Sequence, residues 1–245
     1  MNGQIILDRL IRCGIPCDRA LADRLEIYLT LLLEWNQRMD LTNVTDEEEI
    51  LDRHFADSLI AMTVPDLIPC DGSLIDVGTG AGFPGMALAL ACPRLRVTLL
   101  DSLRKRLDFL QAVCDATGAA NVTLVHARAE DGARQKELRE RFDVAAARAV
   151  APLPVLAEYL LPYVRTGGIA LCWKGPGLAE EIEAGRRAAH LLGGKTGEPI
   201  PAAIPGRDWS HSLLPIRKTG ATPKAYPRKA GTPARSPLGT RKAEE

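Results

Sequence analysis

The sequence predicts an α/β fold in which a mostly parallel sheet carries helices on both of its faces. Short apolar runs alternate with helix-like segments through residues 70–218, a pattern typical of consecutive βαβ units. A glycine-dense turn follows the first apolar run, at the point where a parallel sheet commonly binds its ligand. Apolar residues recur at three- and four-residue spacing within residues 18–39, so we expect a helical N-terminal extension over residues 1–69.

Each expected element is a stretch of apolar residues or of helical periodicity between turn-forming residues. The expected strands are Ser73–Val77, Arg96–Leu100, Val122–His126, Phe142–Ala147 and Gly168–Trp173, and Ser212–Arg217 could add a last one. The expected helices are Met86–Ala91, Leu103–Thr117, Gly132–Arg139 and Val155–Val164, after a first helix within Asp18–Met39.

The composition suits a soluble globular protein with one sizeable core. Of the 245 residues, 46% are hydrophobic and 25% are charged, and no apolar run reaches the roughly 18–20 residues that span a bilayer. The first residues lack the basic segment and long apolar stretch of a secretory signal, so we expect a cytoplasmic protein without membrane contact. The six cysteines are scattered and form no CxxC pair, and we therefore expect no metal site.

The zero net charge hides an uneven distribution along the chain. Residues 217–245 carry eight basic and two acidic residues, whereas residues 1–216 carry a net charge of −6. Residues 219–245 are rich in Pro, Gly, Lys and Arg and lack apolar periodicity, so we expect this tail to run extended or to stay mobile without a partner. A basic tail on an acidic body suggests a polyanionic partner; a solvated tail that only aids solubility is the alternative.

The central motif is the run Asp76-Val77-Gly78-Thr79-Gly80-Ala81-Gly82, which joins the first expected strand to a helix. Glycines in such a turn permit backbone torsions and a close approach of ligand that a Cβ would block. Dinucleotide enzymes use a similar triplet, but the carboxylate of Asp76 is a poor neighbour for a pyrophosphate. S-adenosylmethionine has no phosphate and carries an ammonium and a sulfonium, so it fits Asp76 better. Alternatively, Asp76 only caps the following turn.

A second acidic residue, Asp101, ends the next expected strand. Ligand contacts in a doubly wound sheet gather at the carboxyl ends of the strands, and a carboxylate there can accept hydrogen bonds from both ribose hydroxyls. The alternative is a salt bridge to Arg104 or Lys105.

The next two expected strands also end in charged residues. Glu130 and its neighbouring amides follow the third strand, where an adenine edge would be read, although the adjacent Asp131 is an equally spaced candidate. Arg148 ends the fourth strand. Five guanidinium donors after a buried strand need partners, which could be the ligand or a structural carboxylate.

Several separated motifs resemble the ribosomal RNA small subunit methyltransferase G family, also known as glucose-inhibited division protein B. The resemblance covers roughly Leu32 to Leu238, and its ending Phe83-Pro84-Gly85 after the glycine loop is unusual among methyltransferases. The other matching motifs are Leu33-Glu34-Trp35-Asn36 with Leu41-Thr42, Arg53-His54-Phe55-Ala56-Asp57-Ser58-Leu59, Lys105-Arg106 with Phe109-Leu110, Arg128-Ala129-Glu130, Arg148-Ala149, Lys174-Gly175 and Tyr226-Pro227-Arg228-Lys229.

The resemblance implies a Rossmann-like methyltransferase fold with a seven-stranded sheet, S-adenosylmethionine as cofactor, and methylation of N-7 of one guanine in 16S ribosomal RNA. Since N-7 carries a lone pair and no proton, no general base is needed, and we assign no catalytic side chain. The partner would be 16S ribosomal RNA or the small subunit, and the enzyme a monomer. The cofactor residues expected from the loop and the resemblance together are Asp76, Gly78, Gly80, Phe83, Asp101, Ser102, Leu103, Ala129, Glu130 and Arg148.

RNA contacts are expected from three separate places in the chain. Asn36, His54 and Asp57 could line the substrate entrance, or else form a helix cap with a salt bridge to Arg53 or Arg38. Lys174 should contact a phosphate, and Tyr226, Arg228 and Lys229 combine charge with a stacking surface. We therefore predict that removing residues 219–245 weakens RNA binding and leaves cofactor affinity unchanged. The other histidines, His126, His190 and His211, show no partner pattern and are expected to be structural or exposed.

Two other functions remain compatible with this pattern. The first is a methyltransferase acting on another substrate, and the second is a non-catalytic ribosome-assembly factor that retains the fold. A nicotinamide dehydrogenase is disfavoured by Asp76.

Overall fold

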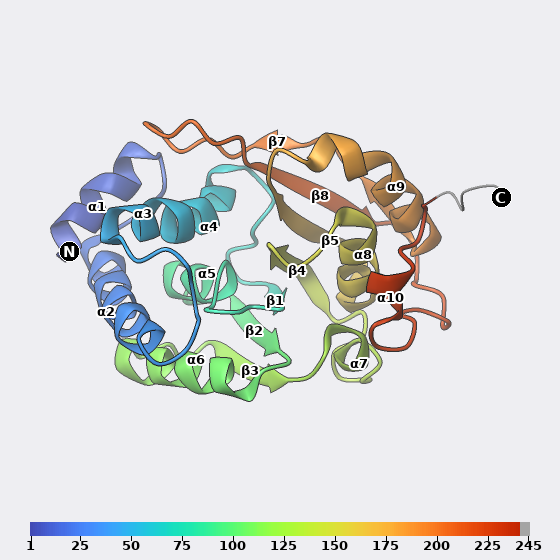
Figure 1. Cartoon of the computed structure of the whole chain (residues 1–245), viewed down its shortest axis with the longest axis horizontal. Helices are drawn as coiled ribbons and strands as arrows, with labels where there is room; N and C mark the ends of the chain where they lie inside the picture. The colour runs from blue at the N-terminus through green and yellow to red at the C-terminus, as the bar shows by residue number, and fades with distance from the viewer. Residues whose placement is uncertain (241–245) are drawn as a thin grey trace.

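A computed structural model describes residues 1–240 and contains one twisted sheet between two layers of helices (Figure 1). The strands are β1 (Ser73–Val77), β2 (Arg96–Asp101), β3 (Val122–His126), β4 (Phe142–Arg148), β5 (Val164–Lys174), β6 (Gly194–Thr196), β7 (Ile200–Pro201) and β8 (Ser212–Lys218). Their order is β3-β2-β1-β4-β5-β8-β6, with β7 also paired to β8. The first five strands are parallel, and β8 runs antiparallel to β5.

The α/β prediction is therefore confirmed, with one difference in strand number. All six expected strands are present, and the seven-stranded path carries the two-residue strand β7 as an eighth. Consecutive residues of β1 enter opposite sides of the core, Leu74 on one face of the sheet and Ile75 on the other. This period of two explains why strands covered on both faces are apolar throughout.

The N-terminal helices cover one face of the sheet together with α5 and α6, while α8 and α9 cover the other. The helices of the first layer are α1 (Gly3–Arg12), α2 (Arg19–Asn36), α3 (Glu47–Ile50), the π-helical turn η1 (Leu51–Ala56), α4 (Asp57–Leu59), the 3-10 turn η2 (Ile60–Thr63), α5 (Gly85–Ala91) and α6 (Arg104–Thr117). The remaining helices are α7 (Ala129–Gly132), α8 (Leu153–Leu160), the 3-10 turn η3 (Leu161–Tyr163), α9 (Leu178–Leu191) and α10 (Thr232–Arg235).

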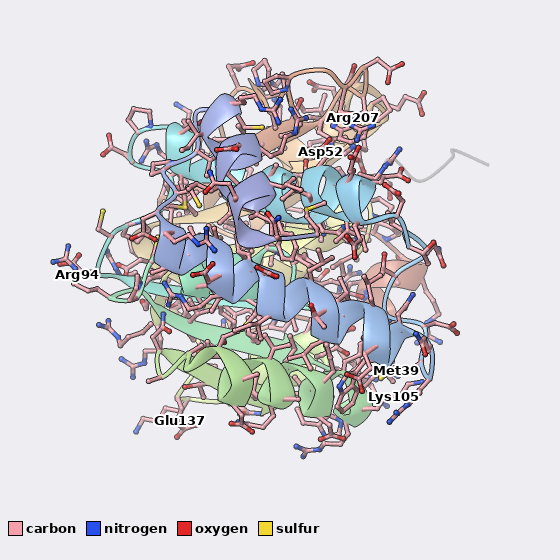
Figure 2. The ribbon with its side chains drawn as sticks, turned by 90° about the vertical axis from the view of Figure 1, so that its left-hand side faces the viewer. Met39, Asp52, Arg94, Lys105, Glu137 and Arg207 are labelled. Atoms are coloured by element: carbon pink, nitrogen blue, oxygen red, sulfur yellow. The ribbon has the colours of Figure 1, made fainter. Side chains whose placement is uncertain are left out.

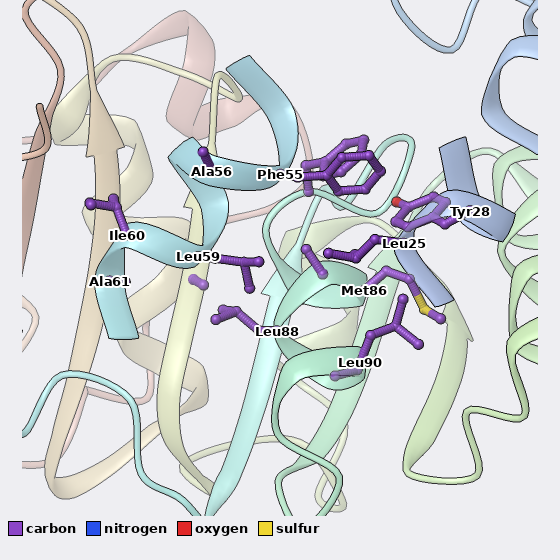
Figure 3. Close-up of a cluster of buried hydrophobic side chains, with 14 of the residues drawn as sticks. Leu25, Tyr28, Phe55, Ala56, Leu59, Ile60, Ala61, Met86, Leu88 and Leu90 are labelled. Carbon is purple, nitrogen blue, oxygen red and sulfur yellow. The ribbon is translucent and has the colours of Figure 1, made fainter. Parts of the chain in front are cut away.

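An aromatic cluster joins the N-terminal layer to the glycine loop. The ring of Tyr28 on α2 stacks on Phe83 with centroids 5.2 Å apart, and Phe55 meets the same ring edge-on at 5.4 Å. Figure 3 shows Tyr28 and Phe55 beside Met86 at the start of α5. The N-terminal helices therefore share one core with the glycine loop.

Polar contacts tie the N-terminal layer to the β7–β8 loop. Figure 2 shows Asp52 and Arg207 close together, and the Arg207 guanidinium donates to the Asp52 carboxylate over 2.6 Å. Arg9 on α1 donates to the other oxygen of Asp52 over 2.6 Å. Because Asp52 is buried, two guanidinium groups compensate for its desolvation.

Two expectations about local structure are wrong. The predicted helix Gly132–Arg139 is absent: α7 ends at Gly132 and residues 133–140 form turns. The side chain of Arg139 donates to the Tyr226 and Thr222 carbonyls instead, so tertiary contacts override the helical propensity of this segment. The tail is not a free arm, since residues 219–240 pack along α7, α8 and α9; Arg241 and Lys242 lie outside the described residues.

Candidate cofactor and substrate site

The glycine loop is a tight turn between β1 and α5. Gly78 and Gly80 both have left-handed backbones, with φ of +75° and +60°, which residues with a Cβ rarely adopt. The Gly78 amide donates to the Leu100 carbonyl over 2.8 Å, and the Gly80 amide donates to Asp101 over 2.9 Å. The loop is thereby fixed to the carboxyl end of the neighbouring strand β2.

A cavity of about 300 Å³ opens at the carboxyl ends of β1 and β2. It lies where β1 has β2 on one side and β4 on the other, which is the topological switch point of the sheet. Five of the predicted cofactor residues line it: Gly78, Asp101, Ser102, Ala129 and Glu130. The lining is completed by Val77, Leu100, Arg106, Ala127, Arg128, Ala149, Val150 and Tyr159. Leu103 and Gly80 are beside this cavity, since both bond Asp101 through their amides.

The carboxylate of Asp101 is buried and held from two sides. Its Oδ2 accepts from the Gly80 amide and its Oδ1 from the Leu103 amide, each over 2.9 Å. The cation beside it is Arg106, at 3.4 Å, and not Arg104 or Lys105. Oδ2 also accepts from the Arg106 guanidinium, whereas Oδ1 keeps a further lone pair for a ligand hydroxyl in the cavity.

Asp76 is fully buried behind the loop and does not line the cavity. Its Oδ2 accepts from the Thr79 hydroxyl over 2.6 Å and from the Gly85 amide over 2.8 Å, so it does cap the turn. Its Oδ1 has no hydrogen-bond partner within residues 1–240. Burial raises the pKa of Asp76 to about 6, partly offset by the Thr79 hydroxyl and the Gly85 amide.

A second cavity of about 410 Å³ adjoins the first. Ala149, in a left-handed conformation with φ of +56°, lines both cavities. The other lining residues of the second cavity are Val44, Arg53, His54, Asp57, Arg148, Ala151, Trp173, Lys174, Gly175 and His211. Three of the predicted RNA residues, His54, Asp57 and Lys174, lie here.

Arg148 lines the second cavity and not the first. From the sequence, it was expected among the cofactor residues. Its guanidinium donates to the Asp57 carboxylate over 2.9 Å and to the Arg53 carbonyl over 2.6 Å. The guanidinium also lies 5.2 Å above the centre of the Phe83 ring. Phe83 itself is buried, and lines neither cavity. The contacts of Arg148 therefore match the alternative interpretation, in which its partner is a structural carboxylate, here Asp57.

His54 is neutral at physiological pH. Burial and the nearby Arg148 charge lower the pKa of His54 to about 4. Its Nδ1 lies 3.3 Å from Arg148, which can only donate, so Nδ1 accepts and the Nε2–H donates to the Thr42 hydroxyl over 2.8 Å. The imidazole also stacks on Phe83 at 4.9 Å, which fixes the plane of the ring.

Asn36 shapes the entrance of the second cavity without lining it. Its Oδ1 accepts from the Leu41 and Thr42 amides, and its Nδ2 donates to the Thr42 carbonyl. Asn36 therefore holds the loop that supplies the partner of His54.

Three of the predicted RNA residues, Lys174, Arg228 and Tyr226, already have contacts within the fold. Lys174 lies at the second cavity but its ammonium is 2.5 Å from Glu181 on α9. Arg228 pairs with the buried Glu158, and Tyr226 packs against the α8–α9 side of the core. Lys229 is exposed, and the tail residues line neither cavity.

Sequence reasoning missed His211, whose Nδ1 lies 2.8 Å from the second oxygen of Asp57. It also missed the platform beside it, where the Arg53 guanidinium lies 4.5 Å above the Trp209 ring and the His211 ring stacks on the same indole. The antiparallel pairing of β8 with β5 brings these residues to the site, and no spacing of residues in the sequence predicts that pairing.

Within residues 1–240, no group of three or more His, Cys, Asp and Glu side chains is arranged to hold a metal ion. In the same residues, none of the helices combines the length and apolarity needed to cross a bilayer.

The family model described as GidB, rRNA small subunit methyltransferase G, matches residues 21–200. The chain is 46% identical over 239 residues to the ribosomal RNA small subunit methyltransferase G of Alkaliphilus metalliredigens (strain QYMF), which covers 97% of this chain and 100% of the relative. It is 40% identical to the protein of the same name from Lactobacillus johnsonii (strain CNCM I-12250 / La1 / NCC 533), with the same coverage.

Among solved structures, the 16S rRNA (adenine(1408)-N(1))-methyltransferase from Catenulisporales acidiphilia is similar in fold. The TM-score is 0.51 at 16% identity, over 67% of this chain and 93% of that one. The family match and the identities over the full length of the relatives agree with the motifs in the sequence. The chain belongs to the ribosomal RNA small subunit methyltransferase G family.

Proposed function

We propose that this protein transfers a methyl group from S-adenosylmethionine to N-7 of a guanine in 16S ribosomal RNA. The observation that carries the proposal is the pair of cavities that share a wall at Ala149, with buried acids at the first and a neutral histidine at the second. The relatives are named ribosomal RNA small subunit methyltransferase G. A variant of the structurally similar adenine methyltransferase has been solved with cosubstrate SAM.

The first cavity suits the adenosine half of the cofactor. Asp101 would accept from the ribose hydroxyls, and Glu130 from the exocyclic amine of adenine. Ser102, Leu103 and Ala129 would flank the purine. The positive charges of the methionine half would lie toward Asp76, the buried carboxylate that lacks a partner on one oxygen.

The second cavity suits the acceptor base. Methyl transfer to N-7 needs alignment of the lone pair with the sulfonium and no proton removal, and alignment alone can supply several kcal/mol. The guanine becomes cationic as the sulfonium becomes a neutral thioether. The Asp57 carboxylate, held by Arg148 and His211, lies in the cavity that would receive this charge.

The phosphate backbone would be bound around this cavity. The Arg53 guanidinium, which lies over the Trp209 ring, would supply positive charge beside it, and Lys174 could exchange Glu181 for a phosphate. We keep Lys229 as an exposed tail contact. We no longer assign an RNA contact to Arg228 and Tyr226, because both make their contacts within the fold.

The test is methylation of three substrates by the purified protein with methyl-labelled S-adenosylmethionine: naked 16S RNA, isolated small subunits and a cell lysate. We expect label at N-7 of one guanine in the RNA or the subunit, mapped by reduction and strand cleavage at 7-methylguanosine. Label only on another molecule would support a different methyltransferase. Cofactor binding without any label would support a ribosome-assembly factor.

Three further properties belong to the same proposal. A monomer is expected, which sedimentation checks. Activity is expected to survive chelation by EDTA, since the proposed transfer uses no metal. A cytoplasmic location is expected and can be checked by cell fractionation.

A further inference from the structure

The C-terminal segment, residues 219–240, lies against the wall of the first cavity that contains Glu130. Figure 1 shows this segment and α10 beside α7 and α8. Arg139, just beyond α7, donates to the Tyr226 carbonyl over 2.9 Å and to the Thr222 carbonyl over 3.0 Å. Arg134 donates to the Pro227 carbonyl. The α7 region is thus joined to the C-terminal segment by several bonds to its backbone.

The strongest anchor of the segment is an ion pair inside the fold. Glu158 on α8 is fully buried, and its two oxygens accept four hydrogen bonds from Arg228, one from the amide and three from the guanidinium, at 2.6–3.1 Å. This contact raises the pKa of Arg228 above its already high value, through the hydrogen bonds to Glu158 first. A buried carboxylate with one cation partner resists separation from it. Tyr159, next to Glu158, lines the first cavity.

The segment then reaches the proposed cofactor ligand itself. The Gly231 amide donates to Oε1 of Glu130 over 2.7 Å. Glu130 is 3% exposed and accepts no other hydrogen bond within residues 1–240. Gly231 has φ of +80°, a torsion that lets its N–H point at this carboxylate and that proline cannot adopt.

We propose that the C-terminal segment is part of the cofactor site, where Arg228 and Gly231 are positioning residues that hold Glu130 toward the adenine amine. The inference rests on the proposed function. It reverses the expectation that the tail can be removed without changing cofactor affinity. With one oxygen of Glu130 held by Gly231, the other is left to accept from the ligand.

The test compares two matched glycine variants, Gly231→Pro and Gly118→Pro. Both glycines have left-handed backbones, with φ of +80° and +68°, and both have open space where a Cβ would be. Each amide donates one hydrogen bond, from Gly231 to Glu130 and from Gly118 to the Cys114 carbonyl at the end of α6. Only the first bond concerns the cofactor site. Each variant is checked for folding by circular dichroism and thermal unfolding.

Two ligands separate positioning from general damage. S-adenosylhomocysteine carries the adenine amine, and S-inosylhomocysteine carries an oxygen in its place. We expect Gly231→Pro to weaken S-adenosylhomocysteine binding about fivefold to tenfold in calorimetry, which corresponds to losing part of one hydrogen bond to a charged group. Binding of the inosine analogue should change little, so the preference of the wild type for the amine should shrink. Gly118→Pro should keep both affinities and the preference.

A second variant covers the case in which Gly231→Pro does not fold. Arg228→Lys keeps the charge beside Glu158 and loses the two-pronged contact, so it should reduce the preference for the amine more mildly. Combining Gly231→Pro or Arg228→Lys with Glu130→Gln should add little to the loss from Glu130→Gln alone. Folded variants with the wild-type preference, or additive losses, would overturn the inference. A wild type that binds neither ligand would instead overturn the proposed function.

Discussion

Binding of S-adenosylmethionine should release a proton from Asp76 near pH 6. Oδ1 of this buried carboxylate has no hydrogen-bond partner within residues 1–240, and burial raises its pKa to about 6. The protonated form is therefore substantially populated in the free protein at mildly acidic pH. A ligand that brings an ammonium and a sulfonium favours the ionised form and lowers the pKa again.

The size of the release follows from the pKa of Asp76. The rise from 3.8 to about 6 means that the surroundings disfavour the ionised form by about 3 kcal/mol, and the charge of the ligand can recover part of this. At pH 6 about half of the molecules carry the proton, so full ionisation in the complex releases about 0.5 proton per cofactor. At pH 7 the release should fall to about 0.1 proton.

The assay is calorimetry of cofactor binding in buffers of different ionisation enthalpy between pH 5.5 and 7.5. The control is Asp76→Asn, whose amide oxygen can still accept from the Thr79 hydroxyl and the Gly85 amide. We expect the pH 6 release in the wild type, less release with S-adenosylhomocysteine, which lacks the sulfonium, and none in the variant. Equal proton release by wild type and Asp76→Asn, or no release at pH 6, would refute the reasoning.

Three further predictions concern the second cavity and its entrance. Arg148→Ala should lower the free energy of unfolding in urea by about 3–5 kcal/mol, because Asp57 is 2% exposed and loses its guanidinium partner. The double variant with Asp57→Asn should lose less than the two single variants together, because the buried charge is then absent. The pKa of His54 is about 4 in the folded protein and 6.5 in the unfolded chain, so the unfolded chain binds more protons between these values. Stability should therefore fall by up to about 3 kcal/mol as the pH drops from 6.5 toward 4. His54→Gln should reduce this pH dependence when unfolding temperatures are measured across the same range. Asn36→Ala should lower the free energy of unfolding by about 1–3 kcal/mol in urea, because its amide makes three hydrogen bonds to the backbone of Leu41 and Thr42; an unchanged unfolding midpoint would contradict this role.

The cofactor cavity was predictable because its residues follow from a rule about parallel sheets. When strands run parallel, their carboxyl ends meet at one edge, so residues that follow them in sequence meet in space. Gly78, Asp101 and Glu130 were selected on this ground, and all three line one cavity. The position of Asp76 was less predictable, since the side chain next to a turn can face the ligand or the turn.

Arg148 shows where this rule stops. Its position at the end of β4 was predictable, but the direction of its side chain depends on which acceptors other elements supply. Asp57 and the Arg53 carbonyl come from the N-terminal layer, more than ninety residues earlier, and they draw the guanidinium into the second cavity. His211 reaches the same carboxylate from the other end of the chain. Such a meeting of three distant segments has no signature in local spacing.

The tail shows that the partner of a basic segment cannot be inferred without knowing which acidic residues of the fold it contacts. Eight basic residues from 217 onward suggested an RNA-binding arm, but one acidic residue in an apolar helix competes for them. Glu158 lies in Leu153–Leu160, where every other residue but Tyr159 is apolar, so folding buries its carboxylate. A buried carboxylate needs a cation more than a solvated phosphate does, because water already stabilises the phosphate. Arg228 therefore belongs to Glu158, and the exposed Lys224, Lys229 and Arg235 are the described basic residues of the tail that remain for RNA.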